Sequence, residues 1–244
     1  MIKIEHVVLA SPEQMDFIIE GMRNPLNSWE KSDSASCCDS YRDCKKYEDC
    51  NDGCPMSGHV DDTDFFLGPN DQNLMQRLSN AGTDHRKFMR MMPVYVRITA
   101  PLYWWKEFDT YKVGSVANSC STMHKIQAKE FTLEDFSCEH MSQKWILEDI
   151  INELNKAREY FNKYDQLDER FKSDYSKKDF WWQMIQLLPS SYNQTRNVML
   201  NYEVLANMYH SRKNHKLDEW RTLCAWIETL PHSELITGNT TKTN

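Results

Sequence analysis

The sequence predicts an α/β fold of the α+β or mixed type, and three observations carry this prediction. A strand-like pattern opens the chain, a clearer one lies near its middle, and helical spacing dominates the second half. This order indicates strands and helices packed together, and not a regular series of β-α-β units. The 244 residues, 40% apolar with eight Trp, suffice for one domain over 1–244, with a Cys-rich insertion at 24–64. A mean hydropathy of -0.72 indicates helices with charged outer faces.

The first predicted elements are a short strand and a capped helix. Ile2 and Ile4 alternate with polar neighbours, which is typical of a strand over residues 1–4. The run Ser11-Pro12-Glu13-Gln14 combines an N-cap Ser, a Pro at the first helical position and a Gln that closes a capping box. We therefore expect a helix from Pro12 that ends near Gly21.

A central strand and a series of helices follow. Val94, Val96 and Ile98 alternate with polar neighbours and predict a strand, which Ala100-Pro101 ends. Further helices are predicted from the 68–71 turn to Ala81, over 102–108, after the capping box at 132–135, and over 147–161, 180–188, 197–212 and 217–230. The charged stretch 165–178 is expected to be a solvated connection.

Charge and composition argue against several classes of protein. The net charge of -7 disfavours a general nucleic-acid binder, because such binding depends on clustered Lys and Arg. A small anionic substrate needs only a few local cations and stays open. The N-terminal residues lack the basic leader of a signal peptide, and no apolar run approaches the roughly 18 residues of a membrane span. We therefore expect a cytoplasmic protein whose eight Cys are reduced, with no membrane partner.

The insertion offers a candidate metal site. Its cysteines follow a C-C-x5-C-x5-C-x3-C pattern that starts at Cys37, and four thiolates in a short loop can close a tetrahedral zinc site. The candidate ligands are Cys38, Cys44, Cys50 and Cys54. The paired C-x2-C steps of a typical zinc site are absent. Plain reduced surface thiols or adventitious disulfides are the alternative.

A small polar run is the second candidate site. It contains Ser115, Asn118, Ser119 and Ser121, and such hydroxyl and amide groups can hold a phosphate or a base edge. An ordinary turn with hydroxyl caps is the alternative. Cys120 within the run is either a reactive thiol or a small buried apolar residue. The aromatic pairs Trp104-Trp105 and Trp181-Trp182 are interpreted as core residues, with base stacking as the alternative.

Two segments, in matching order and separation, resemble the flavin-dependent thymidylate synthase family. The first runs from Ile98 to His124, and with Ala117 taken as a one-residue insertion its matching residues are Ser115, Asn118 and Ser121. In the second, the matching residues are Leu188, Pro189, Asn201, Asn207, Arg212, His215 and Glu219. Gly82 and His85 are similar to the Gly-His step that precedes the central strand of the family.

The chain departs from the family pattern mainly at charged positions. Thr110-Tyr111-Lys112 stands at an Arg-His-Arg triplet, Ser119 stands at a Glu, and His124 stands at a Tyr. Arginines of the family are replaced by Met123, Ile185 and Glu203. By resemblance, several of these arginines hold phosphates with bidentate hydrogen bonds, which Met, Ile and Glu cannot make. Each lost contact is worth about 1.5–3 kcal/mol, so the departures predict a different nucleotide or an altered cofactor.

The resemblance implies a fold, a reaction and a set of site residues. The implied fold has a central, mainly antiparallel sheet flanked by long helices, in a homotetramer whose sites lie between subunits. In the implied reaction, reduced FAD mediates transfer of a methylene from folate to dUMP, with NADPH as the reductant. The implied roles are catalysis for Ser119 and Ser121, substrate binding for Glu107, Lys112, Ser115, Asn118 and Arg212, and cofactor binding for His85, Asn201, Asn207 and His215.

Two functions of different classes stay open. The first is a flavin-type enzyme that binds a pyrimidine deoxynucleotide. The second is a catalytically degenerate homologue that serves as a binding or assembly protein, which the missing arginines favour. Arg212 is ambiguous in the same way, because a cation near a helix C-terminus is also favoured by the helix dipole alone.

Overall fold

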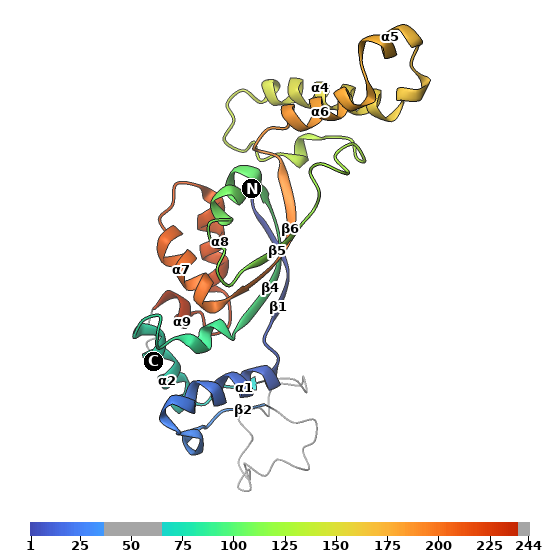
Figure 1. Cartoon of the computed structure of the whole chain (residues 1–244). Coiled ribbons are helices and arrows are strands. Elements are labelled where there is room, and N and C mark those ends of the chain that lie inside the picture. Colours follow the sequence, from blue (N-terminus) through green and yellow to red (C-terminus); the bar gives the residue numbers. More distant parts are fainter. Residues whose placement is uncertain (37–64, 239–244) are drawn as a thin grey trace, which may run out of the picture. The chain divides into compact units, whose positions relative to one another are not determined.

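The computed structural model describes residues 1–36 and 65–238 (Figure 1). The strands are β1 (Lys3–Leu9), β2 (Ala35–Ser36), β3 (Phe65–Phe66), β4 (Pro93–Pro101), β5 (Val116–Ser119) and β6 (Asn193–Asn201). The α-helices are α1 (Pro12–Arg23), α2 (Pro69–Asn80), α3 (Leu102–Phe108), α4 (Lys144–Asn162), α5 (Glu169–Asp174), α6 (Lys177–Leu187), α7 (Tyr202–Arg212), α8 (Asp218–Glu228) and α9 (Glu234–Thr237). The 3-10 helices are η1 (Asn24–Leu26), η2 (Trp29–Lys31), η5 (Lys87–Arg90), η6 (Leu133–Asp135) and η7 (Tyr164–Gln166).

A four-stranded sheet in the order β1-β4-β6-β5 confirms the predicted mixed α/β fold with an antiparallel sheet. Its central pair runs antiparallel with a fixed register. The Leu102 N–H donates to the Tyr192 carbonyl at 3.0 Å at one end, and the Tyr202 N–H donates to the Met92 carbonyl at 3.2 Å at the other. Each central strand continues directly into a helix, β4 into α3 and β6 into α7.

Internal contacts divide the described chain into two compact units. Unit 1 consists of Met1–Glu5, Val96–Lys112 and Ala117–Val198. Unit 2 consists of the other described residues, which include α1, α2 and α7 to α9. The strands β4 and β6 each contribute residues to both units.

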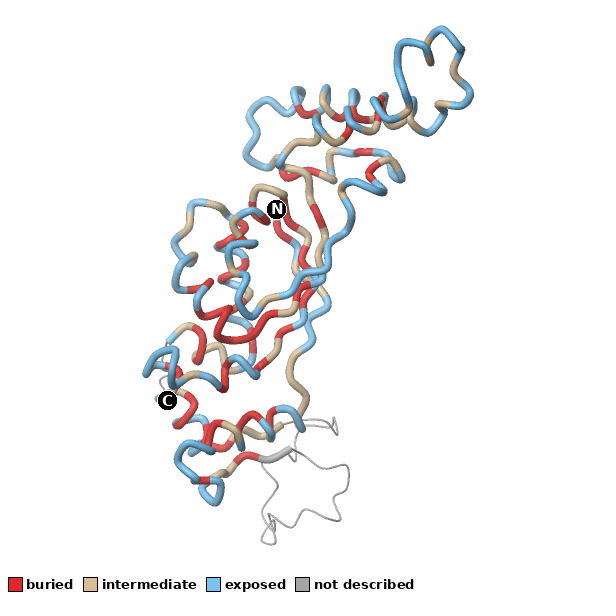
Figure 2. The backbone as a smooth tube through the Cα atoms, viewed as in Figure 1, coloured by how far each residue is buried: buried red, intermediate tan, exposed pale blue. Residues whose placement is uncertain are grey.

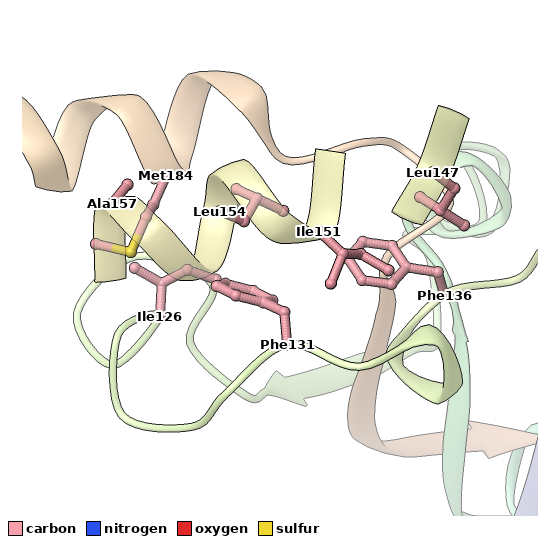
Figure 3. Close-up of a cluster of buried hydrophobic side chains, with 8 residues drawn as sticks. All are labelled: Ile126, Phe131, Phe136, Leu147, Ile151, Leu154, Ala157 and Met184. Atoms are coloured by element: carbon pink, nitrogen blue, oxygen red, sulfur yellow. The ribbon is translucent and has the colours of Figure 1, made fainter. Parts of the chain in front are cut away.

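In unit 1, α4 packs against α6 around an apolar cluster (Figure 3). Leu147, Ile151 and Leu154 of α4 are spaced by four and three residues, so they share one helix face, and all three are buried. The cluster also contains Ile126, Phe131, Phe136, Ala157 and Met184. The amphipathic pattern of the sequence thus predicted this helix correctly, to within three residues at its start.

A second apolar centre of unit 1 lies under α3. Trp104 and Trp105 are 0% and 1% exposed, which confirms their interpretation as core residues. Their ring centroids are 4.8 Å apart in an edge-to-face arrangement, and the Trp105 Nε1–H donates to the Gln194 carbonyl at 2.9 Å. The interpretation of the second pair as core residues is wrong for Trp182, which is exposed, and Trp181 is only half-buried.

Unit 2 begins with the capped helix that the sequence predicts. The Gln14 N–H donates to Ser11 Oγ and the Ser11 N–H donates to Gln14 Oε1, which completes the capping box of α1. The helix continues past Gly21 to Arg23, because Met22 and Arg23 on its last turn are both buried. Burial of these side chains stabilises the last turn by more free energy than one Gly costs within a helix.

A buried ion pair links the end of α1 to the start of α2. Arg23 Nε donates to Asp71 Oδ1 at 2.6 Å, and both side chains are almost inaccessible, at 4% and 0%. The second oxygen of Asp71 accepts hydrogen bonds from Ser32 Oγ, Ser34 Oγ and the N–H groups of Asp33 and Ser34. The Asp33 carboxylate in turn accepts from the N–H groups of Asn70 and Asp71, where α2 begins.

Beside this network, β2 and β3 form a two-stranded antiparallel ribbon, with Ala35 opposite Phe66 and Ser36 opposite Phe65. The predicted insertion at 24–64 therefore begins with ordered structure, since η1, η2 and β2 lie within residues 24–36. The remainder of the insertion lies outside the described residues.

The first part of the predicted helix over 197–212 is a strand, so the prediction was wrong there. Residues 197–201 belong to strand β6, and only residues 202–212 form the helix α7. The reason is that β6 has polar residues on both faces, so neither a period of two nor of 3.6 is visible in its sequence. Pairing with β4 overrides this weak local signal. The charged stretch 165–178 also holds two short helices, η7 and α5, although most of its residues are exposed as predicted (Figure 2).

No helix in the described ranges is both long and apolar enough to cross a bilayer.

The buried ion pair generates a stability prediction. Arg23→Met should lower the free energy of unfolding by about 3–5 kcal/mol, because it leaves the Asp71 carboxylate buried without its cation. Urea unfolding followed by far-ultraviolet circular dichroism measures this. The control is Lys156→Met, which breaks an exposed pair with Glu153 and should cost less than about 1 kcal/mol. Equal losses in the two variants would contradict the prediction.

The same pair predicts a pH dependence. Burial opposes ionisation of Asp71, but hydrogen bonds from Ser34, Ser32 and Arg23 outweigh it and hold its pKa below the ordinary value of 3.8. A lowered folded-state pKa stabilises the fold above the unfolded value, and this stabilisation is lost as the pH falls through the folded value. The difference in unfolding free energy between the wild type and Asp71→Asn should therefore shrink below about pH 4. A difference that stays constant from pH 7 to pH 3 would count against it.

Candidate functional site

The residues predicted for the site are divided between the two units. Unit 1 holds Glu107, Lys112, Asn118, Ser119 and Ser121. Unit 2 holds His85, Ser115, Asn201, Asn207, Arg212 and His215. The candidate zinc ligands Cys38, Cys44, Cys50 and Cys54 lie outside the described residues, and within the described ranges no group of three potential ligands is close enough to hold a metal.

Unit 1 contains a pocket of about 280 Å³ where the ends of β4 and β6 meet the segment after β5. It is lined by Thr99, Cys120, Ser121, Thr122, Glu134, Asp135, Tyr192, Asn193, Gln194 and Thr195. Ser121 is thus the predicted catalytic residue that lines it. Asn118 and Ser119 are exposed on β5, immediately before the lining segment, whereas Glu107 and Lys112 lie at the end of α3 and just after it.

Strand pairing positions the wall of this pocket. Thr99 of β4 and Thr195 of β6 face each other with their Oγ1 atoms 2.7 Å apart. The Cys120 N–H donates to the Thr195 carbonyl at 2.9 Å, and Gln194 Nε2 donates to the Cys120 carbonyl at 2.7 Å. The segment after β5 is therefore held against β6 from both of the Cys120 peptide groups.

Ser121 forms the turn that closes this wall. Its Oγ accepts the N–H groups of Met123 at 3.2 Å and His124 at 2.9 Å, which is the hydroxyl-capped turn that was the alternative to a phosphate cradle. The two backbone donors are occupied by Ser121 itself. Cys120 is exposed, so its interpretation as a buried apolar residue is wrong.

The electrostatics of the pocket favour a neutral polar group. Its lining residues include two carboxylates, Glu134 and Asp135, and Lys129 is paired with Asp135 at 2.8 Å. Burial raises the pKa of Tyr192, so its hydroxyl stays a neutral donor at physiological pH. A base edge or a sugar hydroxyl suits such a lining, whereas a phosphate needs cations.

Arg196 of β6 does not line the pocket but holds Gln194, which does. Its guanidinium lies over the Trp105 ring at 4.2 Å from the centroid, and Nη1 donates to Asp109 at 2.7 Å. Its Nε donates to Gln194 Oε1 at 2.9 Å, which orients the amide that holds Cys120. Arg196 is therefore a positioning residue for the pocket wall.

In unit 2, Asn201 serves as the N-cap of α7. Its Oδ1 accepts the Val204 N–H at 3.0 Å, and its Nδ2 donates to the Gly114 carbonyl at 3.4 Å. Gly114 has a φ of 80°, and a Cβ there would lie 2.9 Å from Asn201 Nδ2, so the turn needs glycine. The side chain of Asn201 is buried and holds the turn that precedes β5; Ser115 is half-buried in this turn.

The other end of α7 carries two further predicted residues. Arg212 is the last residue of the helix and its guanidinium lies 4.8 Å from the centre of the Trp220 ring, so it is half-buried and not a fully solvated charge. His215 Nδ1 accepts the Leu217 N–H at 3.2 Å. Both residues lie near the start of α8.

A cluster of arginines lies at the first turn of α7. Glu203, which stands where the resemblance places an Arg, is paired with Arg86 and with Arg90. Arg86 also donates to Asn207 Oδ1 at 3.0 Å. His85, the residue before Arg86, is exposed in the turn that Gly82 begins.

Sequence reasoning missed several of these residues. The sequence of β6 has no strand signal, so Gln194, Thr195 and Arg196 were not predicted to line or support a site. Tyr192, directly before β6, was missed for the same reason. Arg86 and Arg90 were detectable, since the positive residues of 86–90 directly follow the Gly-His step. No signal in the sequence joins them to Glu203, more than 100 residues further on.

No family model and no curated protein matches the chain. Among solved structures, the flavin-dependent thymidylate synthase of Helicobacter pylori complexed with FAD and dUMP is 15% identical, with a TM-score of 0.61 over 97% of this chain and 98% of that one. A second structure of that enzyme with FAD and dUMP has the same identity and TM-score, over 98% of both chains. A UMP/dUMP methylase from Streptomyces cacaoi bound with 5-Br dUMP is 11% identical, with a TM-score of 0.53 over 98% and 95%. The chain has the fold of these enzymes.

The role of Arg196 generates a further prediction. Arg196→Met should lower the free energy of unfolding by about 2 kcal/mol, since it removes the contact with Trp105 and the hydrogen bonds to Gln194 and Asp109. Thermal and urea unfolding measure the loss. Lys163→Met, directly after α4 in the same unit, is the control, because its exposed Nζ lies 4.0 Å from Glu159 Oε2, and it should cost less than about 1 kcal/mol. A wild-type stability in Arg196→Met would disprove the role.

Proposed function

We propose that this protein is an enzyme that binds a pyrimidine deoxynucleotide and transfers a one-carbon group to C5 of its base, with FAD as cofactor. One observation carries the proposal: the chain matches, over at least 97% of its length, the folds of two enzymes solved with dUMP or 5-Br dUMP. The overlap includes nearly all of both chains in each comparison. The fold alone does not fix chemistry, so the proposal also depends on whether the residues present suit the ligands.

The donors present in unit 2 suit a flavin dinucleotide. Asn207 and His215 supply an amide and an imidazole for the polar edge of a flavin ring. When bound, FAD supplies the two-electron reduction by which a transferred methylene becomes a methyl group. Folate as carbon donor and NADPH as reductant rest on the family resemblance alone.

The pocket of unit 1 suits the pyrimidine nucleoside. Thr99, Tyr192 and Thr195 offer neutral hydroxyls to a base edge or a sugar, and Ser121 forms the turn at the mouth. We propose that Ser119 and Ser121 lie beside the reacting base, with Glu107, Lys112 and Asn118 of the same unit on the rest of the nucleotide. Ser115 and Arg212 of unit 2 stay predicted substrate-binding residues. We further propose a cytoplasmic homotetramer, as the resemblance implies.

The second candidate function is a non-catalytic binding or assembly protein. The observation that favours it is Glu203, an acid at the helix start where the resemblance places a cation. No Lys or Arg occurs among the described residues that line the unit 1 pocket, which agrees with lost phosphate binding there. Under this hypothesis the fold persists while flavin and nucleotide do not bind.

The ultraviolet–visible spectrum of the purified protein, together with titration of FAD and dUMP, separates the two functions. The enzyme should bind FAD, with quenching of flavin fluorescence, and its melting temperature should rise with dUMP, because a ligand of the native state stabilises it by mass action. Colourless protein that binds neither FAD nor any deoxynucleotide would instead favour the binding or assembly protein.

Ser121→Ala tests the pocket directly. It removes the hydroxyl that accepts the N–H groups of Met123 and His124, so the dissociation constant for dUMP should rise about 3–10-fold. Isothermal titration or the dUMP-dependent melting shift measures this. Ser173→Ala, on the exposed face of α5, is the matched control and should bind dUMP like the wild type. The same affinity in both variants would remove Ser121 from the site.

A further inference from the structure

The Glu203 carboxylate in unit 2 binds two arginines at once. Its Oε1 accepts from Arg86 Nε at 3.3 Å and from Arg90 Nη2 at 3.2 Å, and its Oε2 accepts from Arg90 Nε. The Glu203 side chain is 10% exposed, Arg86 is 14% exposed and Arg90 is 50% exposed. Burial opposes ionisation of Glu203, but the two guanidinium groups outweigh it and lower its pKa, so it stays an anion at neutral pH.

The cluster carries more positive than negative charge. Between Asp84 and Arg90, together with Glu203, there are three cations, Arg86, Lys87 and Arg90, and two anions. One arginine would be enough to neutralise the Glu203 carboxylate and to join η5 to α7, but two arginines pair with it. The second guanidinium leaves an excess of positive charge on a surface of which Arg90 is half-exposed.

The donors of the cluster are not all used within the described part of the chain. Arg86 donates through Nε and Nη2, and Arg90 donates through Nε and Nη2, so the Nη1 group of each has no acceptor there. Asn207 is exposed and uses its Oδ1 to accept from Arg86, which turns its Nδ2 away from that bond and leaves it to donate. Held guanidinium groups with unused N–H donors are suited to a phosphate, which accepts several hydrogen bonds at once.

Resemblance places an arginine at the position of Glu203, and the structure shows two arginines from the segment before β4 around that same position. We infer that Arg86 and Arg90 bind the phosphate groups of the ligand of unit 2, and that Glu203 orients them. The ligand chemistry is a phosphate ester, and the diphosphate of FAD is its expected source, because Arg86 lies beside His85 and contacts Asn207. This inference rests on the proposed function and adds residues to it that the family pattern does not contain.

Titration of FAD, riboflavin and dUMP against Arg86→Gln, Arg90→Gln and the wild type tests this inference. Riboflavin carries the flavin ring without phosphate, so its affinity reports ring binding alone. Each Gln variant should weaken FAD about 10–100-fold, the loss of one charge-assisted contact, and leave riboflavin within about twofold of the wild type. Each variant also leaves Glu203 with its other arginine, so the buried carboxylate is never unpaired and the fold should persist, as a melting curve will verify.

Arg77→Gln on α2 is the matched control, since it removes one positive charge from the same unit outside the cluster. It should bind FAD like the wild type. Glu203→Gln separates orientation from net charge. Removal of the acid makes the cluster more positive, so charge alone predicts tighter FAD binding, whereas loss of orientation predicts weaker binding with riboflavin unchanged.

The outcomes are distinct for the two proposals. Weaker FAD binding in both arginine variants, with riboflavin and Arg77→Gln unaffected, supports the inference, and weaker dUMP binding in place of FAD assigns the arginines to the nucleotide phosphate. Unchanged affinity for both phosphate ligands in variants of a protein that binds FAD overturns the inference and leaves the proposed function intact. Tighter FAD binding in Glu203→Gln overturns the orienting role of Glu203. Wild-type protein that binds neither ligand overturns both proposals.

Discussion

The antiparallel pairing of β4 with β6 is the constraint on which the rest of the molecule depends. It sets Thr99 opposite Thr195 in the pocket wall, and it fixes where the two strands pass into α3 and α7. A one-residue slip of this register would turn every side chain of β6 to the other face. Arg196 would then leave the Trp105 ring, and Gln194 would no longer reach the Cys120 carbonyl. The positions of the residues that line the unit 1 pocket therefore depend on the register of β4 with β6.

Two buried carboxylates of unit 2, Asp71 and Glu203, are stabilised by different sets of partners. In unit 2, Asp71 is a fully buried carboxylate, and it is surrounded by one arginine, two hydroxyls and two backbone N–H groups. That number of partners is what a buried charge needs if it is not to be neutralised. Glu203 is also largely buried, but its two arginines are more exposed than it is and retain unused donors. The first cluster is closed and structural, whereas the second faces outward.

The sequence was sufficient for elements with strong periodicity or capping signals. The capping box at Ser11 and the apolar spacing from Leu147 to Leu154 each predicted a helix that the structure contains. The prediction of β6 failed because this strand is stabilised by pairing with β4, about 100 residues earlier, and its own sequence has no strand signal. The candidate site was predicted in part for the same reason. Ser121 was singled out through its local polar run, but Tyr192 and Thr195, which line the same pocket, are brought there only by the sheet.

The ribbon of β2 and β3 has a consequence for how the chain tolerates change. Ser36 and Phe65 are paired across the ribbon, so the segment between them leaves and returns at adjacent points of the fold. The entropy of closing such a loop grows only with the logarithm of its length, by about 0.6 kcal/mol for each doubling. The ribbon therefore fixes the two ends of the connection at a cost to unit 2 that depends only weakly on the number of residues between them.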